Sequence, residues 1–132
     1  MTELDKHIYR PAFFERLCPL LQQHIPGFDS REFIFHIFDN GWPDLSYFER
    51  TRKISRILHR FMPGNFPAAV SLLVGLSSEI GEFENADLEC GFMLDYIEVF
   101  GSEFPLASSL ALEEISRAIH PDLPERSELI QQ

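Results

Sequence analysis

Apolar residues recur three and four positions apart along most of this 132-residue chain, and proline, glycine or asparagine interrupts the pattern every 12 to 20 residues. This spacing is typical of amphipathic helices, and no segment carries the alternating pattern of a half-buried strand. We therefore predict an all-α protein. Its six helices are expected over residues 11–23, 29–38, 46–62, 65–77, 90–100 and 104–119.

Local sequence signals mark several of these helix ends. Asp29 and Ser46 each precede a glutamate by three residues, which is the pattern of a capping box. Pro19 lies inside the first helix and should kink or split it, because proline removes a backbone donor. Gly101 stands where helices commonly end in a left-handed residue. The acidic stretch of residues 78–86 is predicted to be a loop.

The predicted helix pairs begin near residues 11, 46 and 90. A period of about 40 residues suits helical repeats of the HEAT type. We predict a single helical-repeat domain over residues 1–132, with three antiparallel helix pairs stacked as a short HEAT-like solenoid. Periodicity supports a compact helical bundle equally well. The tails, residues 1–9 and 120–132, are expected to be loosely packed.

Composition narrows the class of protein. Hydrophobic residues make up 45% of the chain, enough for a packed core. Neither a membrane-spanning run nor a secretory signal is present, so the expected location is cytoplasmic, with no membrane partner. Cys18 and Cys90 are predicted to be buried thiols. The five histidines lack the spacing of metal ligands, and we predict no metal and no cofactor.

Charge is distributed unevenly along the chain. The formal net charge is −10, and residues 61–116 hold ten acidic residues and no Lys or Arg. Residues 50–60, in contrast, contain five of the eleven basic residues. The molecule is therefore electrically polarised.

Four of these basic residues fall on one face of the predicted helix 46–62: Arg52, Lys53, Arg56 and Arg60. One interpretation is a solvated face that meets acidic residues of this chain or of a neighbour. The other is a nucleic-acid-binding site in which the four side chains contact successive phosphates. No residue is assigned a catalytic role.

Two further features bear on partners. Trp42, the only tryptophan, either closes the core or lies exposed, where it would stack on a base or anchor a partner. The last predicted helix has more apolar residues than one neighbouring helix can cover, so we expect self-association. These residues are Leu106, Leu110, Leu112, Ile115 and Ile119.

Two segments resemble the paired-helix repeats of bacterial DNA alkylation-repair glycosylases of the AlkC and AlkD type. They are HRFMPGNFPAAVSLLVGL, residues 59–76, and FMLDYIEVFGSEFPLASSLALEEISR, residues 92–117. The resemblance covers roughly residues 12–119 and concerns only the N-terminal portion of such proteins. It implies stacked HEAT-like helix pairs whose concave basic surface holds duplex DNA, from which the family removes N3- or N7-alkylated purines. Helix 46–62 would line that groove.

The sequence departs from the family after the last predicted helix. AlkC-like relatives continue with an acidic residue, Phe, two small or apolar residues and Arg-Pro-Phe, whereas here Asp122 and Arg126 keep their spacing without the Pro-Phe element. The repeats that supply the family's base-proximal tryptophans and remaining catalytic carboxylate are not in this sequence. We therefore predict a non-catalytic HEAT-like binding module that acts through protein-protein contacts. The alternative is a DNA-binding or DNA-repair protein, as an enzyme an alkylpurine glycosylase, that uses the basic helix face on phosphates.

Overall fold

A computed structural model describes residues 9–39, 41–81 and 86–119, and within these ranges the regular structure is entirely helical. The predicted all-α class is confirmed. Six helices have nine residues or more: α2 (Pro11–His24), α3 (Ser30–Phe38), α4 (Tyr47–His59), α5 (Phe66–Ile80), α7 (Gly91–Phe100) and α8 (Pro105–Ile119). A single turn, α6 (Ala86–Glu89), and a short 3₁₀ helix, η1 (Trp42–Asp44), complete the described elements.

The predicted caps are present at two helix starts. The hydroxyl of Ser46 accepts a hydrogen bond from the backbone N–H of Glu49 at 3.3 Å, and the Glu49 carboxylate accepts one from the N–H of Ser46 at 3.0 Å. This reciprocal pair is a complete capping box. Asp29 caps α3 by accepting from the N–H of Glu32 at 3.1 Å. Both helices therefore begin where their own sequence specifies.

Two local predictions were wrong, and one of the two alternatives at Pro19 is excluded. α2 continues through Pro19, so proline does not split this helix, and a kink there stays a prediction. Helix α5 extends to Ile80, which is fully buried, and α6 follows, so residues 78–86 are not simply a loop. Gly101 has φ −102° and is not left-handed. A Cβ there would lie 2.2 Å from the Ser108 hydroxyl, so close packing favours glycine.

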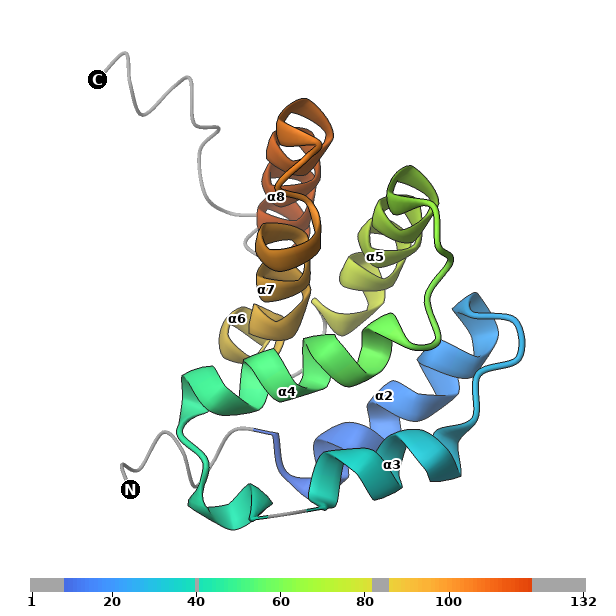
Figure 1. Cartoon of the computed structure of the whole chain (residues 1–132), viewed down its shortest axis with the longest axis vertical. Helices are drawn as coiled ribbons and strands as arrows, with labels where there is room; N and C mark the ends of the chain where they lie inside the picture. Colours follow the sequence, from blue (N-terminus) through green and yellow to red (C-terminus); the bar gives the residue numbers. More distant parts are fainter. Residues whose placement is uncertain (1–8, 40, 82–85, 120–132) are drawn as a thin grey trace.

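Of the three predicted pairs, α2 with α3 and α7 with α8 pack together, whereas α4 and α5 do not pack along each other (Figure 1). α2 and α3 run antiparallel at one end, α4 crosses the middle of the molecule, and α7 and α8 lie together. α4 packs against α7 and α5 against α8, as helices of neighbouring hairpins do in a stack. The first pair is placed differently, since α2 contacts α5 and α3 contacts α4. The three-hairpin solenoid stays a prediction.

One apolar core joins these helices, and aromatic rings form much of it. Phe14, fully buried on α2, packs edge to face against Phe13 at 5.1 Å between ring centroids. It also contacts Phe33 of α3 at 6.4 Å. Such ring pairs stabilise a fold beyond the area they bury. The aromatic content of the chain is therefore mostly structural.

Tyr9 differs from the expectation of a loosely packed N-terminal tail, because it is buried. Its hydroxyl donates to the carbonyl of Leu88 at 3.3 Å, and the hydroxyl of Tyr47 donates to the same carbonyl at 2.6 Å. The backbone of Tyr9 has φ 60°, a conformation that residues other than glycine rarely adopt. Tertiary contacts therefore hold this residue in place. Residues 1–8 and 120–132 of the predicted tails lie outside the described residues.

Candidate functional site

The basic segment of residues 50–60 divides into structural and exposed side chains. Arg50 is 6% exposed, and its guanidinium donates to the carbonyls of Trp42 at 3.2 Å and Pro43 at 3.3 Å. The same group lies 4.9 Å from the centroid of the Trp42 ring. Trp42 itself is buried, so it closes the core and is not the exposed aromatic residue of the alternative prediction. Arg50 and Trp42 together fix η1 against α4.

Lys53, predicted to contact phosphates, is half-buried, and its ammonium donates to the backbone carbonyl of Asp39. Asp39 is the residue that ends α3. A cation at a helix C-terminus interacts favourably with the helix dipole and with carbonyls that lack an intrahelical partner. Lys53 therefore joins α4 to the end of α3, unlike the exposed Arg52, Arg56 and Arg60.

Arg52 and Arg56 are exposed on successive turns of α4, and Arg60 is exposed at its C-terminal cap; we call these three residues the arginine row. Eight residues of helix place the two ends of the row about 12 Å apart along the axis. That length corresponds to between three and four base-pair steps along the axis of a DNA duplex, at about 3.4 Å each. The opposite face of α4 is buried.

No ion pair with a described residue engages the arginine row. Within the described ranges, Arg117 forms an ion pair with Glu113, and His24 and His36 lie close to the carboxylates of Glu79 and Glu32. The predicted meeting of basic α4 with the acidic residues of the second half is therefore not seen among these residues. Asp95, the acid of α7 that does reach α4, instead accepts from the Ser55 hydroxyl at 2.9 Å. The arginine row thus keeps its charge directed toward solvent.

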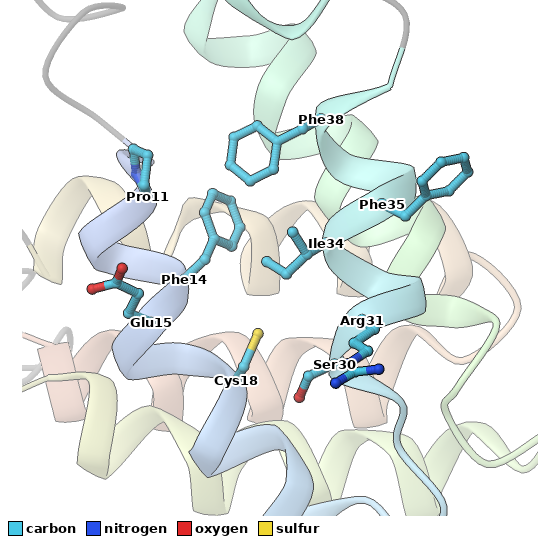
Figure 2. Close-up of a pocket in the computed structure, with 9 residues that line it drawn as sticks. All are labelled: Pro11, Phe14, Glu15, Cys18, Ser30, Arg31, Ile34, Phe35 and Phe38. Carbon is cyan, nitrogen blue, oxygen red and sulfur yellow. The ribbon is translucent and has the colours of Figure 1, made fainter.

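A groove of about 570 Å³ lies between α2 and α3. Its apolar lining consists of Pro11, Phe14, Cys18, Ile34, Phe35 and Phe38. Figure 2 shows Phe14, Ile34 and Phe38 directed into the space between the two helices. The rings of Phe14 and Phe38 meet edge to face at 5.3 Å. We call this feature the α2–α3 groove.

Aromatic exposure is concentrated on the α3 side of this groove. Phe35 is 67% exposed and Phe38 37% exposed. Exposed large apolar side chains beside a groove are typical of an interaction surface. Sequence analysis missed them, although the segment FIFHIF gives α3 an apolar arc of about 200°. An arc that wide must be covered by more than one neighbouring element or contribute to a binding surface.

Cys18 lies at the α2 side of the groove and is buried, as predicted. Burial raises the pKa of its thiol, and the neighbouring hydroxyl of Ser30 acts in the opposite direction. The thiol is therefore protonated at neutral pH and is a poor nucleophile. The chemistry of the groove suits contact with apolar surface.

The described residues contain no cluster of His, Cys, Asp or Glu side chains able to hold a metal ion. Within the same ranges no helix is long and apolar enough to cross a bilayer. Asp122, the acid kept from the alkylation-repair pattern, lies outside the described residues. Comparisons of the chain with protein-family models, with curated proteins and with solved structures found no match. The resemblance to alkylation-repair glycosylases therefore stays a prediction.

Proposed function

We propose that this protein is a non-catalytic binding module whose α2–α3 groove receives an amphipathic helix of a partner protein. The exposure of Phe35 and Phe38 beside an apolar groove of about 570 Å³ carries this proposal. A helix that lays its apolar face into a hydrophobic groove is a recurrent mode of peptide recognition. The HEAT-like relationship expected from the sequence is compatible with such a role, because repeat proteins bind partners on extended surfaces.

Charge at the edges of the groove suggests which helix would fit. Glu15 on α2 and Arg31 on α3 both line the groove and are both exposed (Figure 2). A partner helix with a basic residue on one flank of its apolar stripe and an acidic residue on the other would pair with both. Such pairing contributes more to orientation and specificity than to affinity. The proposed partner is therefore a helix with an apolar stripe and oppositely charged flanks.

Selection from a library of amphipathic helical peptides, followed by fluorescence anisotropy, tests this proposal. Full burial of a phenylalanine side chain contributes about 2 kcal/mol to the free energy of binding. Phe35→Ala should therefore lower the affinity for the selected peptides about 30-fold. Phe48→Ala is the matched control, since Phe48 is 78% exposed and lies on α4, outside the groove. Equal binding to both variants would refute the groove as the binding site.

Light scattering of the free protein distinguishes a second copy from a partner protein. If copies of this chain occupied the groove, the wild type would form a dimer that Phe35→Ala abolishes and Phe48→Ala does not. That result would mean that a second copy of this chain, and not a partner protein, occupies the groove. Self-association is also expected from the exposed Leu106 and Leu110 on α8. The proposed partner helix is supported if the wild type and Phe35→Ala are both monomers and the selected peptides bind the wild type more tightly than Phe35→Ala.

Duplex DNA is a second candidate partner, favoured by one observation. The arginine row is exposed and makes no ion pair with a described residue. We expect Arg52→Glu with Arg56→Glu to weaken duplex binding and to reduce its salt dependence by about two phosphate contacts. Arg31→Glu with Arg117→Glu changes the net charge equally on other helices and is the matched control. Failure of the wild type to bind at about 50 mM salt, or equal losses in both double variants, would exclude this candidate.

A further inference from the structure

A second pocket, of about 550 Å³, lies where the C-terminal ends of α4 and α7 meet the N-terminal end of α5. The side chains that characterise it are His59, Phe66, Tyr96, Phe100, Glu103 and Phe104. We call it the aromatic pocket. Neither the α2–α3 groove nor the arginine row includes any of these residues.

Three stacked or tilted rings form one part of the aromatic pocket. The imidazole of His59 stacks on Phe100 with 4.0 Å between centroids and 7° between planes. Tyr96 packs against the same phenylalanine at 4.7 Å. The His59 Nδ1 lies 3.0 Å from the Tyr96 hydroxyl, a hydrogen bond that fixes the two rings relative to each other. These contacts join α4 to α7 and hold the rings in one arrangement.

A second ring pair lines the pocket from α5 and from the turn before α8. Phe66 and Phe104 stack with 5.1 Å between centroids and 16° between planes. Phe66 is buried, whereas Phe104 is 41% exposed and so presents ring surface to solvent. Aromatic surface therefore reaches the pocket from two directions.

The charge of the lining is negative. Glu103 is the only carboxylate among the described lining residues, and none of them is Lys or Arg. It is exposed, in the second half of the chain, where acidic residues are in excess. A cation in this pocket would therefore interact with Glu103 and with the ring surface that Phe104 leaves exposed.

We propose that the aromatic pocket binds a quaternary ammonium group, either in a free small molecule or as a trimethylated lysine side chain. Methyl groups spread the charge of such a cation and present apolar surface to the rings, and the carboxylate supplies electrostatic attraction. Aromatic surroundings are a common way to recognise quaternary ammonium ligands. An ammonium without methyl groups is more strongly hydrated and loses more on entering the pocket.

Titration of the full chain with choline, followed by NMR chemical shifts, tests this proposal. Choline should shift the resonances of Tyr96, Phe100 and Phe104 with millimolar affinity, and 3,3-dimethylbutanol, its neutral isostere, should bind at least about tenfold more weakly. Absence of shifts in these residues, or equal affinity of the isostere, would overturn the proposal.

Two variants locate the site. Glu103→Gln should lower the affinity for choline about threefold to tenfold, because it removes the negative charge of the carboxylate and leaves the rings in place. Glu98→Gln is the matched control, an exposed acid of α7 that does not line the pocket. Both changes are at exposed positions, so both proteins should fold, as circular dichroism will show. Equal losses in the two variants would contradict a role for Glu103 in the site.

A third comparison identifies the source of the ligand. Trimethyllysine within a short peptide should bind more tightly than choline if the natural ligand is a modified protein, because peptide backbone adds contacts beside the pocket. Equal affinities would indicate a free small molecule. In either case unmodified lysine in the same peptide should bind more weakly than trimethyllysine, and a preference for unmodified lysine would refute the proposed chemistry.

Discussion

Replacement of Arg50 tests whether the basic segment of α4 is partly structural. The guanidinium of Arg50 donates to two backbone carbonyls and lies over the Trp42 ring in a buried site. Hydrogen bonds from a charged donor are worth about 1.5 kcal/mol each at the lower end of their range, which suits bonds of this length. The interaction with the indole ring adds roughly 0.5–1 kcal/mol. Arg50→Ala should therefore lower the free energy of unfolding by about 3.5–4 kcal/mol.

Thermal unfolding followed by circular dichroism and by tryptophan fluorescence measures this loss. For a chain of this length, 1 kcal/mol corresponds to roughly 4 °C in Tm, so Arg50→Ala should melt about 14–16 °C below the wild type. Trp42 is the only tryptophan, and its fluorescence reports on the site itself. Arg50→Met keeps the apolar stem and should recover part of the loss.

Arg52→Ala provides the control, because Arg52 lies two residues away on the exposed face of the same helix. A surface substitution of this kind changes stability by about 0.5 kcal/mol or less. If Arg50→Ala and Arg52→Ala melted within about 2 °C of each other, the distinction between a structural and an exposed arginine on α4 would be refuted.

Three further predictions concern packing, pH and helix capping. In urea titrations, Gly101→Ala should lower the free energy of unfolding by more than about 2 kcal/mol, because the new Cβ would meet backbone and side-chain atoms at 2.2–2.6 Å. Gly75→Ala should leave the free energy of unfolding unchanged or raise it, since the nearest atom is 3.9 Å away. Burial raises the pKa of Tyr96 to about 12, whereas an unfolded tyrosine titrates near about 10. The folded state then binds more protons between these values, so the free energy of unfolding should fall as pH rises from about 10 to about 12, less steeply in Tyr96→Phe. Ser46→Ala should lower the free energy of unfolding by about 1 kcal/mol through loss of the capping box, and Ser71→Ala, at an exposed site within α5, should leave the urea midpoint nearly unchanged.

Helix positions could be predicted because their determinants are close together in sequence. The capping box at Ser46 and Glu49 needs only four residues, and the structure contains it as expected. Gly101 shows the limit of such reasoning. The need for glycine there comes from Ser108 and Phe66, which approach the position from other helices, and no local signal describes that approach. Local sequence therefore predicts elements better than it predicts their contacts.

The candidate surfaces were predicted less well than the helices, because each surface depends on which helix faces are covered by neighbouring helices. A helical wheel places Arg52 and Lys53 on the same face, but only the structure places the carbonyl of Asp39 beside Lys53. The exposure of Phe35 likewise depends on how α2 and α4 cover α3. The aromatic pocket brings together residues from 59 to 104, a separation at which periodicity carries no information.

The shared carbonyl of Leu88 links three distant parts of the chain. Tyr9 and Tyr47 are 79 and 41 residues away from it, and both donate to it. Contacts of such sequence separation close long loops and tend to form late in folding. We expect α6, although only one turn long, to exchange its amide hydrogens together with α4 and not as a frayed segment. A tag or cleavage site introduced near Tyr9 would then loosen the centre of the molecule and not only its N-terminus.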